Sequence, residues 1–492
     1  MNNAIAENNK SYYIAEWRKG YDSQPNEYEY QIEDIEGAIP TELSGTLFRN
    51  GPGLLDIAES PIHHPFDGDG MISAFTFKDG QAFFRNRFIE TKAYVEEKEA
   101  NKILYRGVFG TQKPGGWLNN IFDLRLKNIA NTNVIYWGDK LLALWEAAEP
   151  HSLKPDTLET IGIDYLDGIL EPGDSFAAHP WVDPSSVLDG GKPCLVNFSV
   201  SPGLSSKITV FELNTDGKLL RRHSHSVPGF SFIHDFAITP HYCIFFQNPV
   251  NFNPLPFLFG IRGAGECVQF QPGKPTRVIL IPRDPNNKEV KTFEVESGFV
   301  FHHANAFEKD NKVCIDSIAY ESLPQVQPDM NYKEVDFDLL DPGVLWRFTL
   351  NLQDGTVERE LKEPRCCEFP TIHPDKVGRD YRYLFIGAAH EDTGRNAPLQ
   401  AILKIDWETG ERQSHSFAPH GYVSEPVFVP KPNSSEEDAG WVLTLVYDGK
   451  NHRSTLAILD GQNIEGDAVA LLHLKHHIPY GLHGSWTDSV FV

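Results

Sequence analysis

The chain has 492 residues and a formal net charge of −24. This acidic balance argues against a nucleic-acid partner, because binding a phosphate backbone requires clustered Lys and Arg. The 39 Gly and 34 Pro argue against a protein of long helices and favour a chain that turns often.

Tight turns between short strand-like runs recur along the whole chain. Hairpins are predicted around Asp79-Gly80, Gly138-Asp139, Asp216-Gly217, Asp354-Gly355 and Asp460-Gly461. Short helices are expected only in residues 59–66 and 116–128, and residues 433–438 read as a polar loop. Nearly 500 residues of hairpins without a composition break favour a propeller over a sandwich or barrel. We therefore expect one all-β domain over residues 1–492.

The six cysteines form no CxxC pair, so the sequence predicts neither a thiolate metal site nor a disulfide framework. The N-terminus lacks the basic and apolar regions of a signal peptide. No apolar run approaches the roughly 18 residues that cross a membrane. These features predict a cytoplasmic protein with free thiols.

Four of the 19 histidines lie in apolar or aromatic surroundings: His179 in FAAHPWVDP, His234 in GFSFIHDFAIT, His302 in GFVFHHANAF and His483 in PYGLHGSW. An apolar strand excludes imidazole unless a partner holds it. A metal ion is one such partner, and a hydrogen bond to a carbonyl group is the alternative.

Strand geometry limits which neighbours share a site, because successive side chains point to opposite faces. His234 and Asp235 therefore cannot both face one metal ion, and His302 and His303 must diverge. Asp235 is accordingly not expected to act as a metal ligand.

Three glutamates stand beside residues that read as buried: Glu146 in LLALWE, Glu368 in RCCEFP and Glu425 in YVSEPVFVP. Each is either one half of an edge salt bridge or an acceptor that fixes a ligand imidazole through its other N–H group. The spacing favours the second interpretation. Steps of 55 to 68 residues, the size of one blade with long loops, separate His179, His234, His302, Glu368, Glu425 and His483. Glu146 falls outside this rhythm, 33 residues before His179.

Five motifs occur together and in order: RNGPG (residues 49–53), HPFDGDGM (64–71), FIHDFAIT (232–239), FHHANAF (301–307) and LHGSW (482–486). On these motifs the chain resembles the carotenoid cleavage oxygenase family over essentially its whole length. Within that family it is most similar to the cyanobacterial apocarotenoid-cleaving enzymes. Any one motif alone is weak, but their joint occurrence is highly specific.

The resemblance implies a seven-bladed β-propeller with an N-terminal extension and a cap of helices and loops over an axial metal site. It implies Fe(II) held by His179, His234, His302 and His483, with Glu146, Glu368 and Glu425 as the acceptors behind them. The implied reaction uses O2 to split a central double bond of an apocarotenal into retinal and a second carbonyl product.

The resemblance also implies an aromatic substrate tunnel. Its predicted lining residues are Phe66, Phe109, Trp145, Phe232, Phe301, Tyr320 and Phe369. A rigid, apolar polyene needs such a channel with few polar groups. Core packing is the alternative role for any one of these rings.

One segment, NPVNFNPLPFLFGIRGAG, places Phe252, Leu255, Phe257, Leu258 and Phe259 among prolines in an expected loop. An apolar exposed loop indicates an interface, here a membrane patch beside the tunnel, whereas a loop folded over a blade edge is the alternative.

Two other functions stay open at this point. One is a related iron oxygenase that cleaves a stilbene or a full-length carotenoid, or cuts at another bond. The other is a propeller that binds carotenoids without catalysis. The sequence indicates no further protein partner.

Overall fold

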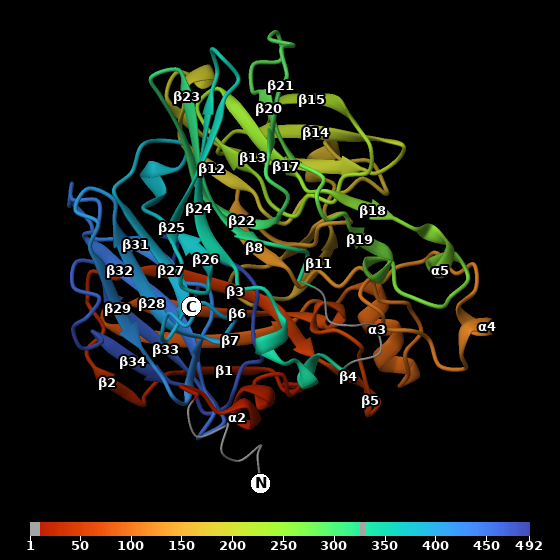
Figure 1. Cartoon of the computed structure of the whole chain (residues 1–492). Coiled ribbons are helices and arrows are strands. Elements are labelled where there is room, and N and C mark those ends of the chain that lie inside the picture. The colour runs from red at the N-terminus through yellow and green to blue at the C-terminus, as the bar shows by residue number, and fades with distance from the viewer. Residues whose placement is uncertain (1–9, 325–330) are drawn as a thin grey trace.

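The structure is a computed structural model that describes residues 10–324 and 331–492. Its main sheets form a ring of seven blades (Figure 1), so the predicted all-β, seven-bladed propeller is confirmed. The first nine residues, part of the predicted N-terminal extension, lie outside the described residues. That the whole chain is one domain stays a prediction.

Five blades are built from strands that follow one another along the chain, each paired antiparallel with the next. Blade 2 holds β8 (Asn133–Trp137), β9 (Lys140–Leu144), β10 (His151–Leu153) and β11 (Thr160–Ile163). Blade 3 holds β12 (Trp181–Ser186), β13 (Lys192–Ser201), β14 (Ser205–Leu213) and β15 (Leu219–Pro228). Blade 4 holds β16 (Ala237–Ile238), β17 (Tyr242–Gln247), β20 (Thr276–Pro282) and β21 (Lys291–Val295). Blade 5 holds β22 (Phe299–Lys309), β23 (Lys312–Tyr320), β24 (Val344–Asn351) and β25 (Val357–Glu363), and blade 6 holds β26 (Cys367–Thr371), β27 (Tyr383–Ala389), β28 (Leu399–Asp406) and β29 (Arg412–Ser416).

The remaining two blades combine strands from both ends of the chain. Blade 1 holds β1 (Tyr28–Gln31), β7 (Gln81–Phe88), β6 (Asp69–Lys78), β3 (Gly45–Leu54) and β35 (Gly484–Thr487) in that order. Blade 7 holds β2 (Ile35–Gly37), β34 (Ala470–His473), β33 (Arg453–Asp460), β32 (Gly440–Asp448), β30 (Gly421–Val423) and β31 (Val427–Pro430). The pairs β3–β35 and β2–β34 therefore close the ring twice.

Short elements outside the blades include two hairpins, β4 (Asp56–Ile57) with β5 (Ser60–Pro61) and β18 (Val250–Phe252) with β19 (Val268–Phe270). Helix α2 (Ile14–Lys19) lies below the ring in Figure 1, near the N-terminus. Helices α3 (Lys92–Ala100), α4 (Trp117–Asn120) and α5 (Pro254–Leu258) lie together on its right-hand side.

Most predicted hairpin turns are confirmed. Asp79 and Gly80 connect β6 to β7 with φ of 52° and 74°, the positive angles of a type I′ turn. The predicted tight turn at Asp460-Gly461 is wrong, because β34 begins only at Ala470 and residues 461–469 form a loop. The Asp460 carboxylate accepts from the Gln462 N–H group at 3.0 Å, which turns the chain away from the sheet.

The helix predictions are only partly right. Residues 116–128 contain the single-turn α4, but residues 59–66 form β5 and the start of a 3₁₀ turn instead of a helix. Pro61 and Pro65 lack the N–H groups that a longer helix needs there. The sequence analysis missed α3, whose Thr91 cap accepts from the Tyr94 N–H and whose mostly charged sequence hides its period.

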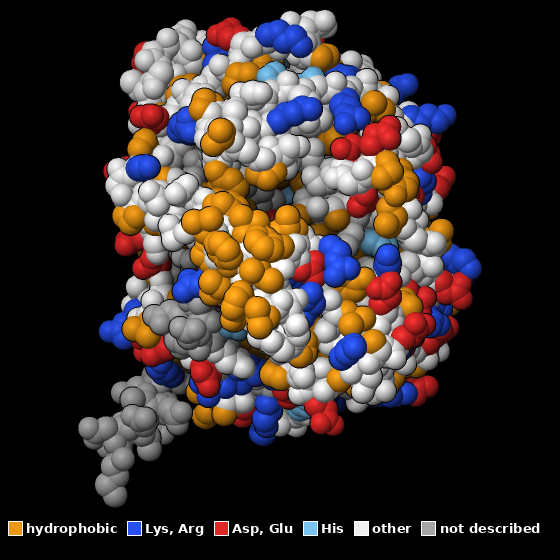
Figure 2. All heavy atoms as spheres, turned by 90° about the vertical axis from the view of Figure 1, so that its right-hand side faces the viewer, with side chains coloured by type: hydrophobic (Ala, Val, Ile, Leu, Met, Phe, Trp, Pro, Cys, Tyr) orange, Lys and Arg blue, Asp and Glu red, His pale blue; other side chains and the backbone are white. Residues whose placement is uncertain are grey.

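The face that carries α4 and α5 is unusually apolar. Figure 2 shows hydrophobic side chains gathered on this face. We call this group the apolar surface, and its exposed members are Trp117, Leu118, Phe122, Leu124, Leu255, Phe259 and Ile261. No helix among the described residues is long and apolar enough to cross a membrane.

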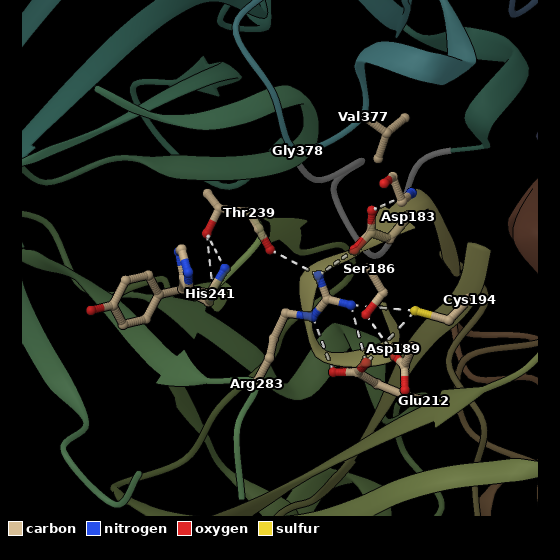
Figure 3. A network of polar contacts seen from close by, with 12 residues as sticks. Asp183, Ser186, Asp189, Cys194, Glu212, Thr239, His241, Arg283, Val377 and Gly378 are labelled. Atoms are coloured by element: carbon tan, nitrogen blue, oxygen red, sulfur yellow. Dashed lines mark hydrogen bonds and ion pairs between the residues drawn. The ribbon is translucent and has the colours of Figure 1, made fainter. Parts of the chain in front are cut away.

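Blades 3 and 4 are joined by aromatic packing and by a buried arginine. The ring of Phe236 stacks on Phe245 at 5.3 Å and meets Phe198 at 4.9 Å. Arg283 follows β20 and is fully buried, and Figure 3 shows it between Asp183 and Glu212. Its guanidinium contacts Asp183 of β12 at 2.6 Å and Glu212 of β14 at 3.0 Å. Arg283 therefore adds a buried positive charge from blade 4 to carboxylates of blade 3 that Arg221 and Arg379 also contact.

We expect Arg283→Met to lower the free energy of unfolding by about 2–3 kcal/mol, because it removes a fully buried cation from Asp183 and Glu212 and leaves them only Arg379 and Arg221 as partners. Arg453→Met, which removes a pair with the exposed Asp34, serves as the control and should cost less than about 1 kcal/mol. Chemical denaturation of both variants measures the difference. Equal losses would contradict the stabilising role of the Arg283 network.

Candidate metal centre

Four imidazoles meet at the inner strands of four blades. His179 precedes β12, His234 precedes β16, His302 lies in β22 and His483 precedes β35. One ring nitrogen from each lies within 4.8 Å of the others. The Nε2 atom of His234 is 3.0 Å from that of His179 and 3.1 Å from that of His302.

Carboxylates contact the far side of three of these rings. The Nδ1 atom of His302 is 2.6 Å from Glu368, and that of His483 is 2.7 Å from Glu425. The Nδ1 atom of His234 contacts Glu146. Because an ionised carboxylate only accepts, Nδ1 carries the proton and Nε2 presents a lone pair.

This donor set fits a bound cation. Lone pairs that face one another at about 3 Å repel unless a positive charge lies between them. Burial and the neighbouring imidazoles lower the pKa of His179 well below its usual value, so its ring is neutral. Burial alone would lower the pKa of His302, but Glu368 outweighs it and raises that pKa to about 9, so a metal ion would take the place of a proton on that ring. A divalent transition metal ligated by neutral imidazole nitrogens satisfies all four rings.

The half-buried carboxylates of Glu368 and Glu425 stay ionised. Burial alone would raise the pKa of Glu425, but His483 and Arg49 outweigh it and lower that pKa below its usual value. Burial acts in the same way on Glu368, and His302 and the Tyr320 hydroxyl lower its pKa. Ionised carboxylates behind neutral ligands offset part of the charge of a metal ion without taking its coordination positions.

Every blade supplies one of these seven side chains. In order from blade 1 to blade 7 they are His483, Glu146, His179, His234, His302, Glu368 and Glu425. Glu146 departs from the regular spacing because it follows β9, the second strand of its blade, instead of lying on the innermost strand.

The neighbouring polar residues point away from the centre, as strand alternation predicts. The Asp235 carboxylate accepts from the backbone N–H groups of Phe236 at 2.7 Å and His303 at 2.9 Å. The His303 ring contacts the Ser317 hydroxyl at 2.7 Å and packs against Phe246. Asp235 thereby holds the strand that carries His302 without reaching the metal centre.

Arg49 joins both ends of the chain at this site, and the sequence analysis missed it although it lies in the RNGPG motif. Its guanidinium donates to Glu425 at 2.5 Å and to the Leu482 carbonyl at 2.9 Å. Gly484 permits this approach, because a Cβ atom there would lie 2.2 Å from the Phe48 carbonyl oxygen. Arg49 on β3 therefore positions the carboxylate that orients His483.

A second group with metal-ligand atoms, Asp189, Cys194 and Glu212, has a different role. Arg221 contacts both carboxylates at 2.5 Å, and Figure 3 shows Arg283 against Glu212 and the Cys194 sulfur. Burial raises the pKa of Cys194 to about 12, so the thiol stays protonated. These acceptors are already neutralised by arginine.

The comparisons with known proteins agree with this geometry. The family model described as retinal pigment epithelial membrane protein, RPE65, matches residues 21–488. The apocarotenoid-15,15′-oxygenase of Synechocystis sp. is 58% identical over 98% of both chains. The chain belongs to the RPE65/carotenoid oxygenase family.

Solved structures and a more distant relative place the chain within this family. The crystal structure of cobalt-substituted Synechocystis ACO superposes with a TM-score of 0.96 at 58% identity, covering 98% of this chain and 100% of that chain. The lignostilbene-α,β-dioxygenase isozyme III of Sphingomonas paucimobilis is 30% identical over 93% of both chains.

Several of the aromatic residues predicted to line a carotenoid tunnel surround the centre. The Phe301 ring lies 5.5 Å from His234, and the Phe369 ring lies 5.5 Å from both His302 and His483. The Tyr320 ring meets Phe301 at 5.8 Å, and its hydroxyl donates to Glu368 at 2.6 Å.

The other predicted tunnel residues lie farther out. Phe66 and Phe109 form a pair with ring centroids 5.5 Å apart. Phe232 reaches Phe301 through Phe299, and Trp145 is buried next to Glu146. Their assignment to a substrate tunnel stays a prediction.

A cavity of about 280 Å³ adjoins this part of the oxygenase centre. Phe66, Tyr320 and Phe369 lie in its wall, together with Glu368. The sequence analysis missed the rest of its aromatic lining, which comes from Trp17, Tyr21, Phe337, Tyr422 and Tyr480. Trp17 comes from α2, Tyr422 from the three-residue strand β30 and the others from connecting segments, all too short for a periodic pattern to mark them.

We expect His302→Ala to lose bound metal and His303→Ala to keep most of it, because only His302 points to the other imidazoles. Metal analysis of the two purified proteins after reconstitution measures this. Equal metal loss from both would refute the assignment of the strand faces.

Arg49→Met should weaken metal binding by about 10–100-fold, as removal of groups that orient metal ligands does elsewhere. Titration with Fe(II) or Co(II), followed by the absorption spectrum of the cobalt form, measures the affinity directly. Arg453→Met is the surface control. An unchanged metal affinity in Arg49→Met would show that Glu425 orients His483 without help.

Proposed function

We propose that this protein is an Fe(II)-dependent dioxygenase that cleaves a central double bond of an apocarotenal with O2. The proposed products are retinal and a second carbonyl compound. The observation that carries the proposal is the four-imidazole centre in a chain 58% identical to an apocarotenoid-15,15′-oxygenase. His179, His234, His302 and His483 are the proposed ligands.

Imidazole ligands alone do not select iron, since they also suit zinc, copper and nickel. Membership of an oxygenase family favours iron over these other metals. Bound there, ferrous iron would supply the redox chemistry and the open coordination position that O2 requires.

The chain's own residues would prepare the site for this chemistry. Neutral imidazoles leave the charge of the metal ion in place, while Glu146, Glu368 and Glu425 hold the rings in one orientation. Phe301 and Phe369 each lie against a ligand imidazole, with ring centroids 5.5 Å apart, and their aromatic faces would exclude water. Such faces also favour positive charge that develops on a polyene.

The proposed substrate channel consists of the aromatic residues around the centre, the predicted aromatic residues that lie farther out, and the cavity beside Glu368. A long polyene gains affinity from apolar contact along its whole length, and few polar groups in the wall compete for it. The proposed lining residues are Phe66, Phe109, Trp145, Phe232, Phe301, Tyr320 and Phe369.

The relative named as a lignostilbene dioxygenase keeps stilbene cleavage as the second candidate. Cleavage of a full-length carotenoid, or at another bond, belongs to the same class of reaction. A carotenoid-binding protein without catalysis is the third possibility, and a complete metal centre argues against it.

Incubation of the Fe(II)-loaded protein with apocarotenals of different length, under O2, tests the proposal by chromatographic product analysis. We expect retinal and a matching second aldehyde, and no product from metal-stripped protein. Cleavage of a stilbene alone would favour the second candidate. Intact substrate in every reaction would refute the enzymatic proposal.

We also propose that the protein, otherwise cytoplasmic, binds a membrane surface peripherally through the apolar surface. Of the five residues predicted for this role, Leu255 and Phe259 are exposed, whereas Phe252, Phe257 and Leu258 are half-buried. Residues 254–258 form α5 instead of the expected loop. The α4 segment supplies further exposed apolar side chains, and lipid-borne substrates would gain a short path to the proposed channel.

The most exposed apolar residues in and just after α4, Leu118 and Phe122, provide the sharpest test of membrane binding. A Leu118→Asp/Phe122→Asp variant should lose flotation with phosphatidylcholine–phosphatidylglycerol vesicles, since both side chains would carry a charge into the lipid interface. Leu204→Asp changes a still more exposed apolar residue, in the turn between β13 and β14 of blade 3, and should float like the wild type. Equal flotation of all three proteins would count against membrane binding.

A further inference from the structure

Arg106 is fully buried beneath the apolar surface, yet no carboxylate pairs with it among the described residues. Its guanidinium donates to the backbone carbonyls of Asp123 at 2.8 Å, Phe257 at 3.0 Å and Arg262 at 2.7 Å. It also donates to the Gln112 side chain at 3.1 Å. Burial lowers the pKa of Arg106. Burying the guanidinium there costs free energy, and the hydrogen bonds to these carbonyls offset that cost. The bonds in turn hold the segments that carry the carbonyls.

The carbonyls belong to the two segments that form the apolar surface. Asp123 follows α4, and Phe257 and Arg262 lie in and after α5. The ring of Phe257 also lies 4.3 Å below the guanidinium carbon, a cation–π contact. Arg106 therefore binds both segments at once from below.

The two segments also meet directly. The Phe122 N–H donates to the Leu258 carbonyl at 2.9 Å. Gly260, with φ of 68°, lies so close that a Cβ atom would be 2.5 Å from the Asn120 carbonyl carbon. This backbone bond and the packing of Gly260 on Asn120 act together with the Arg106 contacts to set the relative position of α4 and α5.

Arg106 begins the segment that carries Phe109, a proposed channel residue. The Asp67 carboxylate accepts from the Phe109 N–H at 2.9 Å and the Thr111 N–H at 3.1 Å. On the other side, the Gly265 N–H donates to the Val108 carbonyl at 2.8 Å. The Phe109 segment is thus connected to the α5 segment through Gly265 on one side. On the other side it is connected to Asp67, the neighbour of the proposed channel residue Phe66.

We propose that Arg106 is a positioning residue that locks α4, α5 and the Phe109 segment into one rigid body, so that the lipid-facing surface and the channel residue keep a fixed relation. Lysine cannot replace it, because its three N–H groups radiate from one point and do not span carbonyls on opposite sides. The uptake role rests on the proposed function, whereas the locking role does not.

Hydrogen–deuterium exchange of the full-length, metal-loaded protein tests the locking role. In Arg106→Met, residues 117–124 and 255–262 should both exchange about tenfold faster or more, while the blades stay unchanged. Arg106→Lys should fall between Met and the wild type. Arg283→Lys alters an equally buried arginine and should not accelerate exchange in these two segments selectively.

Kinetics with two forms of substrate delivery test the uptake role. Arg106→Met should raise the KM for apocarotenal in phosphatidylcholine–phosphatidylglycerol vesicles about tenfold. The kcat with detergent-solubilised substrate should be unchanged, and so should the bound iron. A kcat loss with both substrates and an unchanged vesicle KM would overturn the uptake role.

The two roles fail in different ways. Unchanged exchange, or faster exchange in only one segment, overturns the proposal that Arg106 locks the segments together. Wild-type protein that neither binds vesicles nor cleaves apocarotenals refutes the proposed function, while the exchange experiment still decides the role of Arg106.

Discussion

Mutual repulsion among four imidazole lone pairs is the constraint on which this structure depends. The Nε2 atom of His234 lies 3.0 Å from that of His179 and 3.1 Å from that of His302, so a cation or a proton must lie between facing lone pairs. The rings must therefore be held from behind. Three carboxylates do this through Nδ1, and their charge also offsets part of that of a metal ion.

A propeller meets this constraint because the inner edges of its blades come together around one axis. Each of the seven blades contributes one side chain to the site, four of them imidazoles and three of them carboxylates. The cost is that the site is complete only when the ring is closed. His483 stands beside β35, the strand that pairs with β3, so ring closure and site assembly are one event. Arg49 of β3 links the two sides of the closure, because its guanidinium binds both Glu425 and the Leu482 carbonyl next to His483.

Much of this could be predicted from the sequence, because the signals are local. Paired turn residues mark hairpins, and an imidazole among apolar residues indicates a partner. Strand alternation correctly turned Asp235 and His303 away from the centre. These inferences need only a few neighbouring residues.

The rest depends on contacts between distant segments. No pattern indicated that Glu146 reaches His234 from two blades away, or that Arg49 supports His483 across the closure. The charged helix α3 has too little apolar periodicity to be recognised. At Asp460 a hydrogen bond from the Gln462 N–H group to the side chain directs the chain into a loop instead of the predicted tight turn. The α4 half of the apolar surface was missed because its residues read as an ordinary short helix.

A rigid metal centre is thus joined to an outer surface that is held in position from below. The blades fix the centre, and Arg106 fixes the outer segments to the aromatic residues near it. A binding protein without chemistry would need the aromatic walls but not the complete set of ligands and carboxylates.

X-ray absorption at the iron edge of the Fe(II)-loaded protein tests the central claim most directly. The account predicts a ferrous centre whose scattering is that of four imidazole rings, with no sulfur and no protein carboxylate in the inner coordination sphere. Fewer imidazoles, with carboxylate oxygen or thiolate sulfur in their place, would contradict it.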